Sequence, residues 1–446
     1  MNQDLTNGPI AKSLFLFALP MILGNMLQQL YNLADTLIVG RFLGSNALAA
    51  VGSSYTLMTF LTSILLGLCM GSGALFSIRY GEKNLDDLRS SLFLSFLMIG
   101  CFTILLNLAA FIWIDPIMRF LQVPSSIYNM MRDYLWVIFW GISATFLYNY
   151  FASLLRAIGN STVPLLFLAI SACLNIILDL LFVITFSWGV SGAASATVIS
   201  QFVSGIGITL YALIRFPDLY PQKRHRVFST KVLAEISQFS FLTCIQQSVM
   251  NFGILMVQGL VNSFGTVIMA AFAAGVKIDS FAYMPVQDFG NAFSTFVAQN
   301  YGAGKKDRIR QGIRIAVISS VCFCLTISFL VFLFARPLML IFIQENETEI
   351  LHAGITYLRM EGAFYCGIGC LFLLYGFYRA VKRPEMSVVL TVISLGTRVG
   401  LAYLLSAIPS IGVYGIWVSV PIGWFLADIT GFIYYRIKSR KGLLLS

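Results

Sequence analysis

Charged residues and histidine are scarce in this sequence. Charged residues make up 11% of its 446 residues, and histidine occurs only twice, at His225 and His352. Soluble domains carry about 25% charged residues, so the composition argues against a soluble domain. Two histidines, one in a loop and one near a helix end, also argue against a histidine metal site or a histidine proton relay.

The sequence also lacks the short motifs of the common enzyme classes. It has no His-Glu-x-x-His helix, no Gly-x-Ser-x-Gly nucleophile turn and no nucleotide-binding loop. Its eight cysteines all fall inside apolar segments, which argues against a disulfide framework. We therefore expect neither a membrane-embedded enzyme nor a nucleotide-driven pump, and no cofactor.

Long apolar runs are what the sequence does have. Hydrophobic residues make up 58% of the chain, and a membrane-spanning helix needs about 20 of them in succession. Twelve segments qualify, and the breaks between them carry Gly, Pro, Asp and Ser. They lie at about 13–42, 47–78, 90–113, 129–155, 163–186, 192–214, 232–263, 267–300, 312–335, 352–378, 386–407 and 413–435. The pattern predicts an all-α integral membrane protein with twelve spans.

Lysine and arginine are distributed unevenly between alternate loops. The two termini and the even-numbered loops hold 22 of the 29 lysine and arginine residues, whereas the odd-numbered loops hold only Arg41, Arg119 and Arg336. This asymmetry predicts that both termini lie in the cytoplasm. The net charge of +10 is thus interpreted as a topology signal rather than as a sign of a nucleic-acid partner.

The two halves of the chain repeat each other. Arg156-Ala157 recurs as Arg379-Ala380, 223 positions later, and Arg79-Tyr80-Gly81 recurs as Asn300-Tyr301-Gly302 at an offset of 221. We expect two pseudo-symmetric six-helix bundles that flank a central cleft. The predicted lobes are residues 1–215 and 232–446, joined by a polar cytoplasmic loop at 216–231.

Four polar side chains are predicted to lie at one depth in the first lobe. At 1.5 Å of rise per residue, Asp35, Asp179 and Thr197 fall at similar distances from the outer ends of their spans. Asn175 shares a helix face with Asp179. A carboxylate inside a membrane span is functional by default. The four could form an oxygen cage for Na⁺, a pair of acids that shares a proton, or a network that only joins helices.

Several motifs resemble those of multidrug and toxic compound extrusion (MATE) transporters. Residues 31–41, which contain Asp35, resemble the first-helix signature of that family. Residues 155–160, 192–197 and 299–304 and the pair Asn175-x-x-x-Asp179 match it further along the chain. The resemblance implies cation-coupled antiport by two lobes that rock between outward-open and inward-open states. It also implies that Asp35, Asn175, Asp179 and Thr197 form the coupling-ion site, for Na⁺ or H⁺, with no other metal.

The second lobe does not duplicate this site. The repeat offset of 223 places Arg398 at the position of Asn175, and Ala402 at that of Asp179. Glu361 and Asp288 are expected deep in the membrane, with Lys277 and Asp279 nearer the outside. Because unpaired charges are costly in a membrane, Lys277, Asp279, Glu361 and Arg398 are expected to pair with one another. By resemblance, Asp288 is on a cleft-lining helix and is a candidate contact for a cationic substrate.

The remaining candidates for substrate contacts are polar residues in the middle of symmetry-related spans. With Asp288 they are Gln28, Tyr31, Asn32, Gln246 and Gln247. Hydrogen bonding between helices is the competing interpretation for the glutamines. We expect a monomeric antiporter that exports amphipathic, cationic drugs or metabolites. The alternative is a flippase for a lipid-linked substrate, although a flippase cleft should be more cationic than these acids allow.

Overall fold

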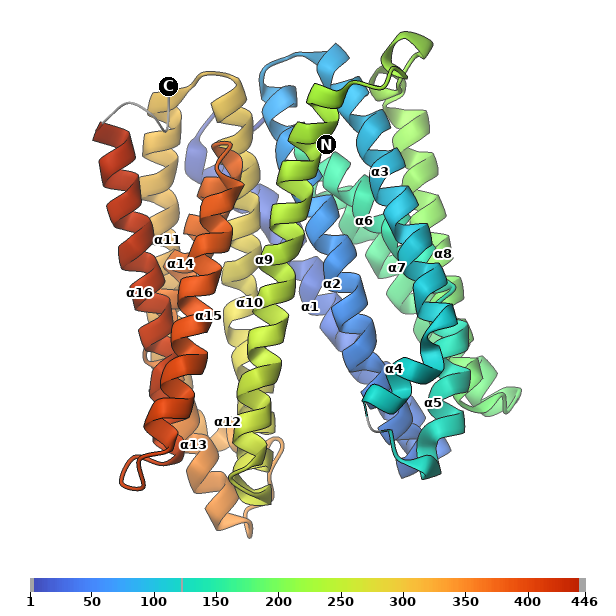
Figure 1. Cartoon of the computed structure of the whole chain (residues 1–446), viewed down its shortest axis with the longest axis vertical. Helices are drawn as coiled ribbons and strands as arrows, with labels where there is room; N and C mark the ends of the chain where they lie inside the picture. The colour runs from blue at the N-terminus through green and yellow to red at the C-terminus, as the bar shows by residue number, and fades with distance from the viewer. Residues whose placement is uncertain (1–3, 122, 441–446) are drawn as a thin grey trace. The chain divides into compact units, whose positions relative to one another are not determined.

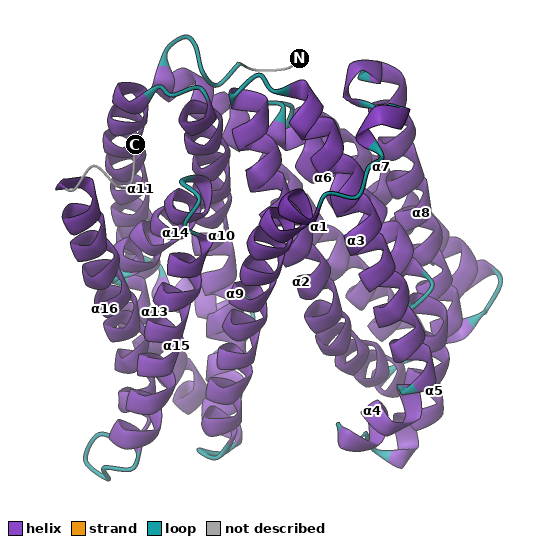
Figure 2. Ribbon diagram, turned by 45° about the horizontal axis from the view of Figure 1, so that its top comes forward, coloured by secondary structure: helices purple, strands orange, loops and turns teal. Residues whose placement is uncertain are grey.

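The computed structural model describes residues 4–121 and 123–440. Over this range the chain is helical and carries no strand, with short loops between the helices (Figure 2). In lipid there is no water to hydrogen-bond the backbone N–H and C=O groups, so they must bond to one another. An α-helix meets this requirement within a single segment. The predicted all-α fold is confirmed.

The first half of the chain forms eight α-helices (Figure 1). These are α1 (Ile10–Leu43), α2 (Ser45–Gly81), α3 (Leu85–Ile112), α4 (Ile114–Phe120), α5 (Ser125–Ile138), α6 (Gly141–Ala157), α7 (Thr162–Asp179) and α8 (Gly189–Arg215). A π-helical turn, η1 (Leu180–Thr185), follows α7. Two short 3₁₀ turns, η2 (Pro217–Leu219) and η3 (Lys223–His225), follow α8.

The second half begins with α9 (Thr230–Asn262). It continues with α10 (Thr266–Gly302), α11 (Lys306–Leu333), α12 (Ala335–Leu340), α13 (Thr348–Gly362), α14 (Tyr365–Ala380), α15 (Pro384–Ser406) and α16 (Val413–Arg440). Ten helices among the described residues are long and apolar enough to span a membrane. Two bent pairs, α5 with α6 and α13 with α14, pass the same test together, which gives up to twelve spans, as predicted.

The two bends occur at corresponding places in the halves. The chain turns by 46° between α5 and α6, and by 50° between α13 and α14. The sequence analysis treated 129–155 and 352–378 as single continuous spans, because both are predominantly apolar. In each case the structure divides the span into two helices.

The chain forms two compact units, and two of the boundaries between them fall inside helices. The first unit contains Asp4 and residues 19–244, and the second contains residues 5–18 and 245–440, so α1 and α9 each contribute to both. The segment 216–231, which we expected to link the lobes, belongs to the first unit by its contacts.

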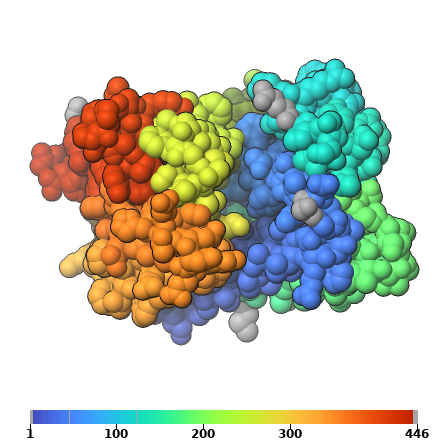
Figure 3. All heavy atoms as spheres, turned by 90° about the horizontal axis from the view of Figure 1, so that it is seen from below, coloured from blue at the N-terminus to red at the C-terminus, as the bar shows by residue number. Residues whose placement is uncertain are grey.

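Matching helices pack together within each unit. In the first unit α2 packs on α6, and α7 on α8; in the second α10 packs on α14, and α15 on α16. These pairs are equivalent under the internal repeat. In the second unit α13 also contacts α16. Figure 3 shows the molecule from below, where the α12–α13 segment (orange) lies beside the turn between α15 and α16 (red). The packing pattern reflects the pseudo-symmetry seen in the sequence.

Candidate functional site

Three helices of the first unit bring the four predicted polar side chains together. Asn175 and Asp179 lie one turn apart on α7, and their exposed fractions are 2% and 0%. The side-chain amide of Asn175 donates to the hydroxyl of Thr197 on α8, at 3.3 Å. Asp35, on α1, lies close enough to Asp179 for the two carboxyl groups to interact electrostatically. The structure therefore brings the four side chains into one cluster.

The backbone changes its winding directly after Asp179. The residue ends α7, and the π-helical turn Leu180–Thr185 follows at once. The indole of Trp188 stacks on the ring of Phe182, with centroids 4.7 Å apart, and closes this turn. The apolar sequence of the turn gave no sign of it.

The cluster contains buried oxygen atoms that have no hydrogen-bond donor. In the described part of the chain no donor reaches Oδ1 of Asp35, Oδ1 of Asn175 or either carboxyl oxygen of Asp179. Buried polar atoms are nearly always hydrogen-bonded, so a group of four that are not needs an explanation. Two adjacent carboxylates, one buried at Asp179 and one half-buried at Asp35, also repel each other where little water screens them. A bound cation or a shared proton would satisfy both requirements.

Two tyrosines surround the cluster. The hydroxyl of Tyr134, on α5, is within electrostatic reach of both Asp35 and Asp179. Tyr31 lies one turn before Asp35 on α1 and interacts with the side chain of Gln28. The sequence analysis did not select Tyr134, because a tyrosine in an apolar span resembles a packing residue.

The oxygen atoms of Asp35, Asn175, Asp179 and Thr197 are suited to bind a hard monovalent cation or a proton. Across the described residues, no three His, Cys, Asp or Glu side chains gather as a metal-binding cluster. A Na⁺ ion at this place would be held by the two carboxylates together with the Asn175 and Thr197 oxygens, since hard cations prefer oxygen ligands.

The second unit holds a separate acidic cluster. Asp279 on α10 accepts hydrogen bonds from the hydroxyls of Tyr357, at 2.6 Å, and Tyr365. The Tyr357 hydroxyl also lies 3.1 Å from Oε2 of Glu361. Arg398 on α15 is close enough to interact electrostatically with both acids. Three of the four residues of the predicted charge network are therefore brought together.

The expected depths in this unit need correction. The sequence analysis separated Glu361 from Asp279, but each lies 13 residues after the first residue of its helix, Thr266 or Thr348. The two carboxyl groups therefore lie close together, and the Tyr357 hydroxyl reaches both. Lys277 is not in the cluster: it is exposed, and its Nζ lies 5.8 Å from the ring centroid of Phe342.

The other basic residues that the sequence places inside spans also have partners. Arg132 donates to Oδ1 of Asp115 at 3.0 Å. The guanidinium of Arg359 lies 5.1 Å from the ring centroid of Phe332, which is a cation–π distance. A further carboxyl that the sequence analysis overlooked, Asp428 on α16, lies near Cys370 and Tyr375.

The candidate substrate contacts are divided between the units. Gln28, Tyr31 and Asn32 lie on α1 in the first unit; Gln28 is exposed and the other two are half-buried. In the second unit Gln246 and Asp288 are buried, and Gln247 is half-buried. Asp288 lies nine residues beyond Asp279 on α10, about 14 Å along the helix axis.

The chain resembles known membrane proteins over nearly its whole length. The MatE family model matches residues 20–181 and 240–404. The "Probable multidrug resistance protein YpnP" of Bacillus subtilis is 30% identical, over 99% of this chain and 98% of the relative. YoeA of the same organism, which bears the same description, is 26% identical over 99% of this chain and 96% of the relative. A solved outward-facing structure of a MATE transporter superposes with a TM-score of 0.91 at 22% identity and covers 97% of each chain.

Proposed function

The chain belongs to the MatE family of membrane transporters, and on this premise we propose that it exports small organic molecules in exchange for Na⁺ or H⁺. The coupling cation binds in the first unit, at Asp35, Asn175, Asp179 and Thr197. The substrates are amphipathic and cationic, in keeping with relatives that are named multidrug resistance proteins. The transporter acts as a monomer in the bacterial cytoplasmic membrane, with both termini in the cytoplasm.

The observation that carries the proposal is a pair of neighbouring carboxyl groups, that of Asp179 fully buried and that of Asp35 half-buried. Asp35 and Asp179 interact with each other, and three of their oxygen atoms have no hydrogen-bond donor among the described residues. A Na⁺ ion or a proton bound between the two carboxyl groups removes their mutual repulsion and gives their oxygen atoms a partner. A cluster that only joined helices would use amides, which can donate as well as accept.

The second acidic cluster is built differently. In the second unit Asp279 already receives two tyrosine hydroxyls, and Arg398 supplies a positive charge nearby. We therefore assign the coupling role to the first unit and a structural role to the cluster of Asp279, Glu361 and Arg398.

Exchange requires that the cation and the substrate oppose each other's binding. Uptake of the cation at Asp35 and Asp179 lowers the affinity for substrate, which then leaves on the outer side. By thermodynamic linkage, substrate must lower the cation affinity by the same factor. A measurement of either effect therefore predicts the other.

The test uses the full-length protein in energised vesicles, with Na⁺ and pH gradients imposed separately and export of a cationic dye as the readout. We expect one of the two gradients to drive export. Asp35→Asn should abolish the coupled export at normal expression, and Asp179→Asn should alter the ion dependence. Asp133→Asn is the matched control, because Asp133 is exposed on α5 and the charge change is the same.

Two results would contradict the proposal. Export by Asp35→Asn at the wild-type rate would remove Asp35 from the coupling site. Unchanged Na⁺ and pH responses in Asp179→Asn would remove Asp179 from it.

A further inference from the structure

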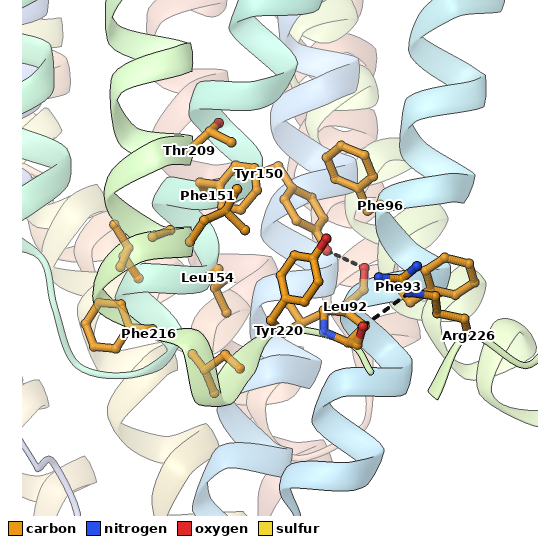
Figure 4. A pocket seen from close by; sticks show the side chains of 15 residues that line it. Leu92, Phe93, Phe96, Tyr150, Phe151, Leu154, Thr209, Phe216, Tyr220 and Arg226 are labelled. Atoms are coloured by element: carbon orange, nitrogen blue, oxygen red, sulfur yellow. Dashed lines mark hydrogen bonds between the residues drawn. The ribbon is translucent and has the colours of Figure 1, made fainter. Parts of the chain in front are cut away.

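A cavity in the first unit lies apart from the polar cluster. It has a volume of about 340 Å³ and is enclosed by α3, α6, α8 and the segment after α8. Its walls come from helix ends: Leu92 lies two turns after the start of α3, and Leu154 and Ala212 lie in the last turns of α6 and α8. Figure 4 shows the aromatic side chains of Phe96, Tyr150 and Phe151 around this space.

The interior of the cavity can accommodate only an apolar group. Most of its lining is Leu and Phe, and the hydroxyls of Tyr150 and Thr209 are already hydrogen-bonded to backbone carbonyls. The Tyr150 hydroxyl donates to the carbonyl of Leu92 at 2.7 Å, and the Thr209 hydroxyl donates to the carbonyl of Gly205 at 2.6 Å. A polar ligand would lose its hydrogen bonds to water here and gain few in return.

One guanidinium stands at the edge of this apolar space. Of the 15 residues that line the cavity, Arg226 alone is charged. Its Nε donates to the carbonyl of Pro221 at 3.2 Å, and its guanidinium lies 5.8 Å from the ring centroid of Tyr220. Arg226 is exposed and forms no ion pair with the described carboxylates, whereas Arg224 next to it pairs with Asp86 at 3.0 Å.

The segment around Arg226 has the composition of a membrane interface. Val227 and Phe228 follow it directly and are strongly exposed, at 63% and 67%, and Lys223 is exposed on its other side. Apolar side chains mixed with lysine and arginine at the end of a span are typical of chain that contacts both acyl chains and lipid headgroups.

We propose that this cavity binds one acyl chain of an anionic phospholipid, whose phosphate is held by Arg226. An apolar interior with a single unpaired guanidinium at its edge complements an apolar chain that ends in an anion. The volume is at the lower end of the roughly 300–1,000 Å³ typical of small-molecule sites, so it fits one chain rather than a whole lipid. This site is separate from the coupling site and does not depend on its role.

The first experiment measures lipid retention by native mass spectrometry of the full-length protein. Phosphatidylglycerol and phosphatidylcholine with identical chains are titrated separately. We expect wild type to retain one phosphatidylglycerol, and Arg226→Gln to bind it about fivefold more weakly, the scale of one basic residue at an anionic lipid. Lys223→Gln is the matched control, because it removes the same charge from the same segment without lining the cavity. Glycerol phosphate should not compete, because it has no acyl chain.

The second experiment locates the chain. Ala212→Leu fills the cavity and should release the lipid while Arg226 remains. In wild type, phosphatidylglycerol with a photoreactive group on its chain should crosslink to peptides that contain residues 92–96 or 209–213. Equal retention of the two lipids by wild type, unchanged retention in Arg226→Gln, or crosslinks confined to other helices would each overturn the proposal. Crosslinking does not depend on any variant, so it decides the question even if Ala212→Leu fails to fold.

Discussion

Arg308 donates two hydrogen bonds to the carbonyl oxygen of Leu5, from Nε and Nη2, each at 3.2 Å. It donates two more to the carbonyls of Asn7 and Gly8, both at 2.8 Å. The Lys305 ammonium adds a bond to the carbonyl of Thr6 at 2.6 Å. The segment before α1 is therefore fixed to the start of α11, within the second unit, and the Leu5 side chain is fully buried.

Arg308→Gln should release this segment. Hydrogen bonds from a charged donor contribute about 1.5–3 kcal/mol each to stability, so their loss should make local opening far easier. Amide hydrogen exchange over residues 5–8 should become faster by about tenfold or more, with the rest of the second unit unchanged.

Arg310→Gln serves as the control for this prediction. Arg310 lies half a turn further along α11 and pairs only with Asp307, at 3.1 Å, where both side chains are exposed. Exposed pairs of this kind contribute about 0–1 kcal/mol. If Arg308→Gln left the exchange of residues 5–8 as slow as Arg310→Gln does, the hydrogen bonds of Arg308 would not be what holds the segment.

Gly71 allows α2 to approach the first part of α9 within the first unit. A Cβ on Gly71 would overlap the carbonyl of Phe239, and next to it the hydroxyls of Ser72 and Ser240 lie 2.7 Å apart. Small residues permit such backbone contacts between membrane helices. Gly71→Ala should lower the unfolding temperature in detergent, with a cost of about 1–3 kcal/mol or more, because the neighbouring atom is backbone and cannot rotate away.

Gly52→Ala is the matched substitution on the same helix. A Cβ at Gly52 meets nothing within 4 Å. Alanine is the better helix former by up to about 1 kcal/mol, so this variant should be neutral or slightly more stable. Equal unfolding temperatures for the two variants would show that the contact at Gly71 has room to relax.

The sequence predicted most features that depend on local pattern. Apolar length predicted the spans, and a rise of 1.5 Å per residue led us to expect that Asp35, Asp179 and Thr197, which the structure brings together, lie near one another. The bends at 139–140 and 363–364 and the π-helical turn after Asp179 were not predictable, because hydropathy is continuous across them. The pairing of Asp279 with Glu361 and Arg398 was expected, but the greater depth expected for Glu361 was wrong, because the relative depth of two residues depends on where their helices begin.

Asp115 should give the protein a small dependence of stability on acid pH. Hydrogen bonds from Arg132, at 3.0 Å, and from Tyr128, at 2.9 Å, hold the pKa of the Asp115 carboxyl below its usual value. Because the folded-state pKa is lowered, the stabilisation is complete above the unfolded pKa of about 3.9 and is lost as pH falls through the folded pKa.

Comparison with Asp115→Asn isolates this effect. Wild type should unfold at a slightly higher temperature than the variant at pH 5 and above, and the difference should vanish as the pH is lowered below about 4. The difference is small because Asp115 and Arg132 are both partly exposed. A difference that stays constant between pH 3 and pH 7 would mean that the Asp115 charge does not contribute.

Tyr357 and Tyr365 lie on either side of the bend between α13 and α14, and both donate to Asp279. A straight helix would place side chains eight residues apart about 12 Å along its axis, so the bend helps both hydroxyls to reach one carboxyl. Either single change to phenylalanine removes one donor, which should cost about 1–3 kcal/mol, measured as a lower unfolding temperature.

The double variant Tyr357→Phe/Tyr365→Phe should lose more stability than the sum of the two single changes. With one tyrosine left, the buried carboxyl of Asp279 keeps a donor; with neither, the cost of its burial is no longer offset by either hydroxyl. Tyr403→Phe, at an exposed position on α15, is the control and should change nothing. Strict additivity would show that each hydroxyl acts independently, and the two tyrosines would then not be joint partners of Asp279.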